Sequence, residues 1–577
     1  MPFGSRNGGV VDRIWLEHYP RGVPAEIDVN EYASAREAFE ESCRKFATRP
    51  AFSCMGRSIS FADLDALSST FGAWLQHQGC AKGTRVALMM PNILQYPVCL
   101  FGALRAGCTI VNVNPLYTAR ELEHQLVDSG AEVIVVVENF ARTLQEVVAR
   151  TKIRQVVVTS IGEMLAVKGR LVDLVLRRVK KVVPKFSLPG AIRFSDAMRQ
   201  GRKLSLTRVP LGHDDLAFLQ YTGGTTGIAK GAMLLHRNIV ANMLQARAWV
   251  RPILDDNRRE VILTPLPLYH IFALTANCLV FMSVGGENVL ITNPRDIPHF
   301  VKEMRRYRFT AMTGVNTLFN ALLHNEKFAQ LNFKSFRLTL GGGMAVQEAV
   351  AKRWKAVTGV TLVEAYGLTE TSPAATMNPL DATEYTGAIG LPIPSTDLAL
   401  RDDAGKDVPL GQPGEICIHG PQVMAGYWQR PDETAKVMTA DGFFMTGDVG
   451  KMDPKGYVTI VDRKKDMILV SGFNVYPNEI EGVVVMLPGV LECAAVGILD
   501  KKSGEAVKLF VVRRDPALTA EQVLDHCRNH LTAYKCPRDV EFRRELPKSN
   551  VGKILRRELR DEARRAASTP PVHAQVT

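Results

Sequence analysis

Apolar and polar positions along the first 140 residues alternate between short apolar runs and longer segments with helical spacing. Residues 86–90, 109–113 and 133–137 are mainly apolar runs of strand length. The segments between them, residues 93–106 and 119–129, have the period of amphipathic helices. Because strand and helix alternate at this spacing, the pattern predicts a parallel sheet with helical crossovers.

The same alternation returns in the middle of the chain and then changes. Strands are predicted at residues 261–265, 310–312 and 338–343, with a helix at residues 275–283. From about residue 397, short β-like runs are separated by turns rich in Gly, Pro and Asp, which is typical of a small β-rich subdomain. After Arg463 the α/β pattern resumes with many charges. The predicted fold class is therefore α/β, with parallel-sheet subdomains followed by a small β-rich one.

One helical segment, residues 164–186, combines apolar and basic residues. Leu171, Leu174, Val175, Val179 and Val182 share one face, and Lys and Arg residues lie mostly on the other. Such a helix can lie on an anionic membrane. The alternative, which the pattern favours, is a surface helix packed on its own domain.

Composition and charge narrow the class of protein. The chain has 577 residues, too many for one core, with 46% hydrophobic and 23% charged residues, as in globular proteins. The net charge of +12 favours anionic partners, and no nucleic-acid motif is present. Ten cysteines without a C-x-x-C pair indicate buried thiols in a reducing compartment, with no zinc site or disulfide framework. No apolar run is long enough to span a bilayer, so we expect a cytoplasmic protein.

A loop rich in Gly and Thr occupies residues 221–231, between an apolar strand and a second apolar run. Glycines let backbone N–H groups converge on an anion, hydroxyls add donors, and Lys230 adds a positive charge. The loop is not a Walker A motif, because Gly231 follows Lys230. Composition alone leaves open a flexible loop without a ligand. The candidate phosphate-binding residues are Tyr221, Thr222, Gly223, Gly224, Thr225, Thr226, Gly227 and Lys230.

Four further motifs follow in the chain. A proline-rich turn at residues 265–270 ends in Tyr269 and His270, and residues 446–448 form Thr-Gly-Asp at a predicted turn. Each of the four is weak alone, since turns favour Gly and Asp and a single His is more often structural. The other candidate residues are Gly341, Gly342 and Gly343 at a strand end, Tyr366, Thr369 and Glu370 after the next β-run, and Lys553 in the final motif at residues 547–553.

Taken in order, the five motifs resemble the adenylate-forming superfamily of acyl-CoA synthetases, non-ribosomal adenylation domains and luciferases. The resemblance runs from about residue 35 to 565. Residues 441–450 and 460–465 are similar to the signature of long-chain fatty acyl-CoA synthetases. The sequence departs from the superfamily at Gly223 and Ala229, where Ser and Pro are more frequent.

The resemblance implies a ligase that uses ATP, Mg²⁺ and coenzyme A. A fatty acid carboxylate would attack the α-phosphorus of ATP, and coenzyme A would then take the acyl group. Thr222 to Lys230 would hold the β- and γ-phosphates, and Glu370 with Thr222 would hold Mg²⁺. His270 and Tyr269 would lie beside the acyl carbon.

The resemblance also assigns the remaining residues. Tyr366 would stack on adenine against the glycines at 341–343. Asp448 would accept from the ribose hydroxyls, and Arg463 would add a ribose contact. Lys553 would bridge the substrate carboxylate and the α-phosphate in the first step.

A domain movement is implied as well. Lys465 falls at the family's hinge, so the resemblance places an N-terminal AMP-binding domain at residues 1–464, with its β-rich subdomain at about 395–464. A small mobile α+β domain at residues 465–577 would carry Lys553. In the second step Gly472 would line the pantetheine channel.

Several alternative functions are compatible with the sequence. They are a medium-chain or aryl acyl-CoA ligase, a fatty acyl-AMP ligase serving a carrier protein, and a non-catalytic binding protein, which would be expected to lack Lys553 or Glu370. Contact with the inner face of an anionic membrane and a homodimer are also left open.

Overall fold

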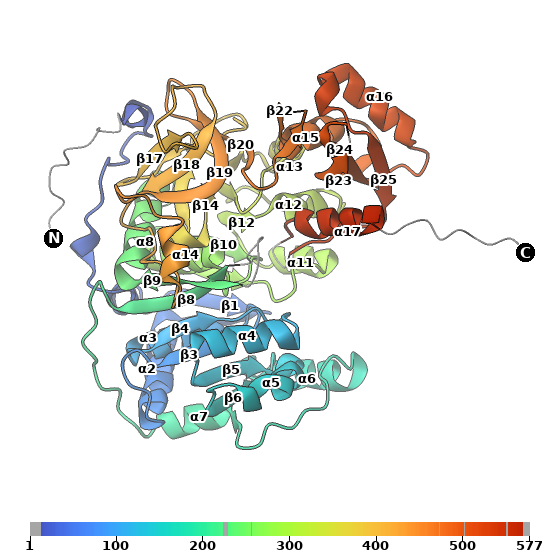
Figure 1. Ribbon diagram of the computed structural model, residues 1–577. Coiled ribbons are helices and arrows are strands. Elements are labelled where there is room, and N and C mark those ends of the chain that lie inside the picture. Colours follow the sequence, from blue (N-terminus) through green and yellow to red (C-terminus); the bar gives the residue numbers. More distant parts are fainter. Residues whose placement is uncertain are drawn as a thin grey trace, which may run out of the picture. The chain divides into compact units, whose positions relative to one another are not determined.

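The computed structural model describes residues 13–222, 229–254, 257–471, 473–500, 502–549 and 552–568. The chain divides into two compact units, whose elements are drawn in Figure 1. The N-terminal unit consists of Asp12–Asp397 and Ile418–Phe444. The C-terminal unit includes Leu398–Cys417 and Met445–Thr577.

A seven-stranded sheet in the N-terminal unit has the order β7-β6-β5-β3-β4-β8-β9. Its strands pair in parallel except for the hairpin of β8 and β9. The strands at its centre are largely buried and mostly apolar because helices cover both of their faces. The bounds are β3 Arg85–Met89, β4 Thr109–Asn112, β5 Val133–Val137, β6 Gln155–Thr159, β7 Ile192–Arg193, β8 Leu216–Thr222 and β9 Lys230–Leu235.

A nine-stranded sheet in the same unit has the order β16-β15-β14-β13-β12-β10-β11-β1-β2. Its middle strands are parallel, and antiparallel pairs close both edges. The bounds are β1 Pro50–Cys54, β2 Arg57–Ser60, β10 Val261–Thr264, β11 Glu287–Leu290, β12 Ala311–Gly314, β13 Leu338–Gly341, β14 Leu362–Gly367, β15 Ala374–Met377 and β16 Leu391–Pro392. The predicted α/β class with parallel sheets is confirmed.

One apolar core joins the two sheets of this unit. It contains Phe52 and Ile262 from the nine-stranded sheet and Val86 and Phe218 from the seven-stranded sheet. A second cluster packs on the other face of the seven-stranded sheet, under α4. The helices are α1 Ala35–Lys45, α2 Phe61–His77, α3 Gln95–Arg105, α4 Ala119–Ser129, α5 Ala141–Val147, α6 Ala166–Leu174, α7 Phe194–Gly201, α8 His236–Val250, α9 Ile271–Ala273, α10 Val280–Ser283, α11 Ile297–Met304, α12 Asn316–Leu323, α13 Glu348–Thr358 and α14 Pro431–Ala435.

In the described part of the chain, two helices contain a π-helical segment. The helix predicted at residues 275–283 begins as the π-helix η6, Leu274–Leu279, before α10. The π-helix η5, Val175–Val179, continues α6. Among the described residues, no helix is long and apolar enough to cross a membrane.

The C-terminal unit contains most of a four-stranded sheet, β17-β18-β19-β20, and a five-stranded sheet in which β25 pairs with β24. Helices α15 and α16 cover one face of the five-stranded sheet, and α17 covers the other. The bounds are β17 Asp397–Arg401, β18 Gly414–His419, β19 Phe444–Met452, β20 Val458–Arg463, β21 Ile468–Val470, β22 Phe473–Val475, β23 Val490–Asp500, β24 Gly504–Arg513, β25 Asp539–Arg543, α15 Pro477–Val484, α16 Ala520–His530 and α17 Arg556–Ser568.

Candidate functional site

The Gly/Thr loop connects the two strands of the β8–β9 hairpin. Thr222 and Lys230 are paired at its base, directly before and after the loop. Beside them, a Cβ atom on Gly231 would lie 3.2 Å from the ring of Tyr221, so a glycine allows this close approach. The hydroxyl of Tyr221 donates to Asp128 Oδ2 at 2.6 Å and anchors the hairpin on α4. Predicted residues Gly223, Gly224, Thr225, Thr226 and Gly227 lie outside the described residues.

Lys230 is held by an acidic and an aromatic side chain. Its Nζ lies 2.8 Å from Glu433 Oε2 and 4.5 Å from the centroid of the Tyr427 ring. Lys436 also pairs with Glu433. Hydrogen bonds from Lys230 and Lys436 lower the pKa of Glu433 to about 2, so this carboxylate is ionised at neutral pH.

Glu370 is a buried carboxylate in the short 3₁₀ turn η7, Thr369–Thr371, which follows β14. The hydroxyl of Tyr427 donates to its Oε1 at 2.7 Å, and the Met424 N–H donates to its backbone oxygen at 2.8 Å. Turn η7 contacts both β8 and β9. The hairpin that carries Lys230 and the turn that carries Glu370 are therefore neighbours.

The carboxyl ends of β13 and β14 bring Gly341, Gly342 and Gly343 next to the strand that carries Tyr366, because the two strands pair in parallel. A Cβ on Gly342 would lie 3.0 Å from the ring of Phe272, and Gly343 has a φ of +78°. Glycine is therefore favoured at both positions, by close approach at Gly342 and by the left-handed backbone at Gly343.

His270 caps the N-terminus of α9, where its Nδ1 accepts from the Phe272 N–H at 3.4 Å. The preceding residue, Tyr269, is tied to the hairpin because Gln220 Nε2 donates to its backbone oxygen at 2.8 Å. The turn predicted from its prolines is thus fixed to β8.

A second group of predicted residues lies in the C-terminal unit. Asp448 on β19 and Arg463 on β20 are cross-strand partners, and Arg463 Nε lies 3.3 Å from Asp448 Oδ1. Asp448 is 5% exposed. Gly447 before it has a φ of +73°, which explains the glycine of the Thr-Gly-Asp turn.

Lys553 and Lys465 belong to the same group. Desolvation, and after it the charge of Arg463, lowers the pKa of Lys553 to about 7. Desolvation and Arg463 also lower the pKa of Lys465 to about 8. Asp448 opposes both shifts, and Asp466 also opposes that of Lys465. Gly472 lies outside the described residues.

Comparison with known proteins assigns the chain to a family. A family model described as AMP-binding enzyme matches residues 39–428, and one described as AMP-binding enzyme C-terminal domain matches residues 479–553. The chain belongs to the AMP-binding enzyme family. The predicted superfamily is confirmed.

Individual relatives and solved structures support the same family assignment for this AMP-binding enzyme. A long-chain-fatty-acid–CoA ligase of Yersinia pestis is 58% identical over 97% of this chain and 100% of the relative. The crystal structure of the anthranilate CoA ligase AuaEII in complex with anthranoyl-AMP has a TM-score of 0.82 at 25% identity, covering 94% of this chain and 100% of that one. ATP-bound MatB from Rhodopseudomonas palustris has a TM-score of 0.77 at 29% identity, covering 92% and 99%.

Residues 426–433 of this AMP-binding enzyme were missed by the sequence analysis. The segment pairs with β9, because Met233 N–H donates to Gly426 and Trp428 N–H donates to Gly231. It thereby brings Tyr427 to Glu370 and Glu433 to Lys230. The signal in the sequence is an aromatic pair, Tyr-Trp, followed by Gln-Arg-Pro-Asp-Glu.

Glu364 on β14 is the other missed residue. Its Oε1 accepts from the Val346 N–H at 2.9 Å. The Tyr385 hydroxyl donates to the backbone oxygen of Val346 at 2.6 Å. Burial raises the pKa of Glu364 to about 7. Glu364 therefore fixes the backbone that follows the three glycines.

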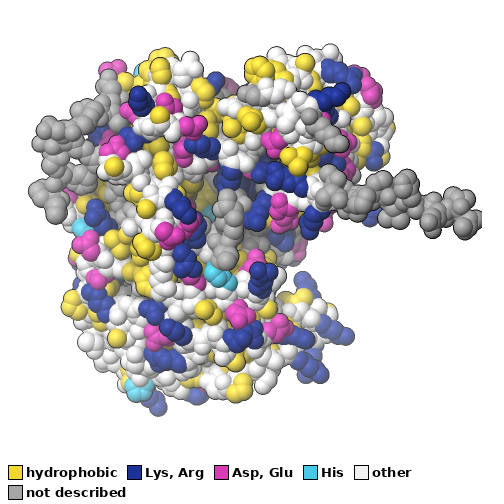
Figure 2. Space-filling model, in the orientation of Figure 1, with side chains coloured by type: hydrophobic (Ala, Val, Ile, Leu, Met, Phe, Trp, Pro, Cys, Tyr) yellow, Lys and Arg dark blue, Asp and Glu magenta, His cyan; other side chains and the backbone are white. Residues whose placement is uncertain are grey.

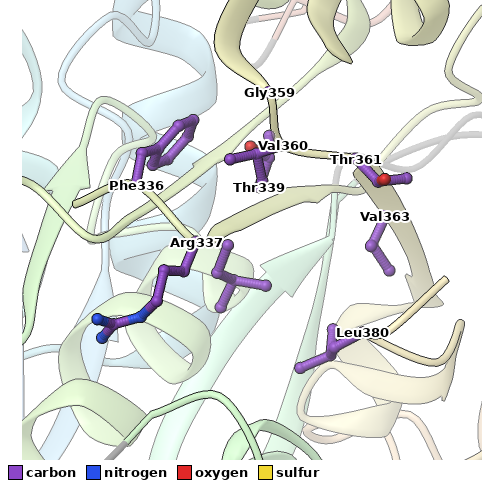
Figure 3. A pocket seen from close by; sticks show the side chains of 9 residues that line it. Phe336, Arg337, Thr339, Gly359, Val360, Thr361, Val363 and Leu380 are labelled. Carbon is purple, nitrogen blue, oxygen red and sulfur yellow. The ribbon is translucent and has the colours of Figure 1, made fainter. Parts of the chain in front are cut away.

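A pocket of about 280 Å³ lies at the amino ends of β13 and β14, away from the glycines at 341–343 (Figure 3). Its lining comes from residues 336–339, residues 359–361, Val363 and Leu380. None of the predicted site residues lines it. Parallel sheets bind ligands at the carboxyl ends of their strands, whereas this pocket is at the amino ends of β13 and β14. We therefore do not assign it to the reaction.

Proposed function

We propose that the chain joins a long-chain fatty acid to coenzyme A at the expense of ATP. An oxygen of the fatty acid carboxylate attacks the α-phosphorus, the bond to the bridging oxygen breaks, and pyrophosphate leaves. The thiol of coenzyme A, losing its proton, then attacks the acyl carbon of the acyl-adenylate, and AMP leaves. The observation that carries this proposal is the match to long-chain-fatty-acid–CoA ligases over nearly the whole chain.

In the N-terminal unit the proposed work is phosphate binding. Lys230 and the loop that begins after Thr222 would bind the β- and γ-phosphates. The paired strands support this, because they hold a lysine and a threonine at the base of a Gly/Thr loop. Preorganised charges of this kind stabilise the charge that develops on a phosphoryl group without further rearrangement.

Glu370 and Thr222 are the proposed holders of Mg²⁺. Carboxylate and hydroxyl oxygens suit this cation, and Glu370 is buried and oriented by Tyr427. Bound there, Mg²⁺ would supply charge neutralisation at the phosphates. Among the described residues, no group of three or more His, Cys, Asp or Glu side chains is placed to hold a metal ion. Phosphate oxygens and water would therefore complete the coordination.

The remaining roles concern adenosine and the acyl group. Tyr366 and the glycines Gly341–Gly343 would hold adenine, and Thr369 and His270 would lie near the acyl group. Asp448 would accept from the ribose hydroxyls, with Arg463 beside it. The Asp448–Arg463 pair supports this role because it fixes the carboxylate in one orientation.

Lys553 would donate to the α-phosphate and the acyl carboxylate during adenylation only. Lys465 is the proposed hinge, with domains at residues 1–464 and 465–577, and the segment at Gly472 would replace Lys553 for the second step. The low pKa of Lys553 fits a group that meets negative charge only when its substrates are bound.

Pyrophosphate release tests the function directly. We expect release with long-chain fatty acids and thioester formation only when coenzyme A is added. Release with 4-coumarate or medium-chain acids in preference to long-chain acids would assign the alternative ligases. Full release with acyl-AMP accumulating despite coenzyme A would indicate an acyl-AMP ligase. No release with any acid would overturn the enzyme proposal.

The proposed location is the cytoplasm, with peripheral contact to the inner face of the membrane. A homodimer is the remaining proposal, and the mass in solution tests it. Neither the membrane contact nor the homodimer changes the proposed reaction.

A further inference from the structure

The helix formed by α6 and η5 packs on its domain through small and polar residues together with Val172. A Cβ on Gly169 would lie 1.8 Å from the backbone oxygen of Gly162, so the two backbones touch. Asp173, 9% exposed, accepts from Ser160 Oγ at 2.6 Å and from the Gly162 N–H at 2.8 Å. Arg177 pairs with the buried Glu138 at 2.8 Å. The polar side of this helix therefore faces the protein.

The apolar side chains on the outer surface of this segment form what we call the apolar ridge. Its residues are Val167, 84% exposed, Leu171, 62%, Leu174, 54%, Val179, 73%, and Val182, 47%. An ordinary surface helix turns such residues inward. Here these five apolar residues lie on the outside, so the packing favoured by the sequence pattern accounts for only one side of the helix.

Basic residues surround the apolar ridge. Exposed Lys168, Arg170, Arg178, Lys180 and Lys181 lie within residues 164–186, and Figure 2 shows Lys and Arg side chains gathered over this helix. Asp173 is the only acidic residue in that stretch, all of which the structure describes. Because Asp173 is turned inward and hydrogen-bonded, the outer surface is apolar and positively charged.

We propose that the apolar ridge inserts into the headgroup region of an anionic lipid bilayer and is the membrane-docking surface of the enzyme. A helix with exposed Leu and Val and flanking Lys and Arg binds such a surface by apolar burial and by attraction to lipid phosphates. The inward side already has its hydrogen bonds and ion pair, so docking needs no unfolding. The choice of a bilayer also rests on the proposed long-chain substrate, which partitions into membranes.

Vesicle co-sedimentation tests this surface in the absence of ATP and fatty acid. Wild-type protein is expected to bind vesicles of phosphatidylcholine with phosphatidylglycerol, and to bind pure phosphatidylcholine weakly. The double variant Leu171→Ser/Leu174→Ser should bind the anionic vesicles at least about tenfold less, because it lacks two aliphatic side chains that the bilayer would bury. The matched control is Val127→Ser on α4, which removes an exposed apolar side chain elsewhere and should bind as wild type does.

A charge variant separates the two contributions. Lys180→Gln/Lys181→Gln should weaken binding to anionic vesicles at low salt and leave binding to neutral vesicles unchanged. Equal binding by the wild type and the double serine variant would overturn the proposal. So would a wild-type dimer that the serine variant dissociates, because the apolar ridge would then contact a second copy.

The reaction is measured separately. Pyrophosphate release from a long-chain fatty acid dissolved in detergent, without vesicles, should be the same for the wild type and the serine variant, and both should unfold at the same temperature. Loss of vesicle binding with release intact supports docking. Release that fails for the wild type as well concerns the proposed function and leaves the vesicle result standing.

Discussion

The Tyr427 hydroxyl donates to Glu370 Oε1 at 2.7 Å, and the ring of the same tyrosine lies under Lys230. One side chain therefore orients both a carboxylate and a cation of the proposed nucleotide site. Burial, together with the neighbouring carboxylate, raises the pKa of Tyr427, so the hydroxyl keeps its proton as a donor.

Replacing Tyr427 with Phe should weaken the response to Mg²⁺. The ring under Lys230 stays, while Glu370 loses a donor that fixes its orientation. The Mg²⁺ concentration for half-maximal pyrophosphate release should rise about tenfold, as expected for a lost hydrogen bond to a charged group. The control is Tyr19→Phe, which removes a hydroxyl that donates to the Pro392 oxygen at 2.5 Å. An unchanged Mg²⁺ dependence for Tyr427→Phe would remove Tyr427 from the site.

Replacing Glu433 with Gln should strengthen ATP binding. Lys230 would no longer be paired with a carboxylate at 2.8 Å, so the phosphates would not compete with it. We expect KM for ATP to fall by roughly threefold, because an exposed ion pair competes only modestly with the phosphates. Glu348→Gln, which breaks the exposed pair with Lys352, is the matched control and should leave KM unchanged. A higher KM would mean that Glu433 positions Lys230 for the phosphates.

Lys553→Ala should separate the two half-reactions. Adenylation, followed as pyrophosphate release, should fall about 10²–10³-fold because a charged contact to the transition state is lost. Thioester formation from supplied acyl-AMP should be largely retained. Lys548→Ala, which removes a nearby lysine paired with Glu492, should affect neither step. Equal loss of both half-reactions would contradict the domain movement.

The pH dependence of adenylation should report the low pKa of Lys553. The charged form is required, and its pKa of about 7 means that the free enzyme loses this charge as the pH rises through 7. The value of kcat/KM for ATP should therefore decline above pH 7. The decline in kcat should come at higher pH, since bound phosphates favour the charged lysine.

Lys553→Arg is the control for this profile. Arginine stays protonated throughout, so the decline near pH 7 should disappear even if the overall rate is lower. A wild-type profile that stays flat between pH 6 and 9 would contradict the assignment. The depressed pKa also affects the free energy of unfolding. Burial of the neutral Lys553 side chain becomes less favourable as the pH falls from 10.5, the ordinary pKa of lysine, towards 7, because only the unfolded chain takes up the proton in that range.

Local patterns were sufficient for many elements. The strand at residues 133–137 and the helix at residues 119–129 were predicted with the bounds that the structure has, because continuous apolar runs and capped amphipathic periods are local signals. Helix α1 begins after Ser34, whose side chain accepts from the Glu37 N–H, while the Glu37 carboxylate accepts from the Ala33 N–H.

Sequence alone determined the family, the order of the motifs and the chemistry of their residues, because each motif is contiguous. Tertiary structure decided which side chains meet. Tyr427 and Glu433 are far from Glu370 and Lys230 in the chain, and only pairing of their segment with β9 brings them together. Tertiary structure also decided the orientation of α6, since helical period gives two faces but not which one packs. Buried hydrogen bonds to Asp173 and the close approach of Gly169 to Gly162 hold the opposite side of the helix on the domain, so Leu171 and Leu174 are left in solvent.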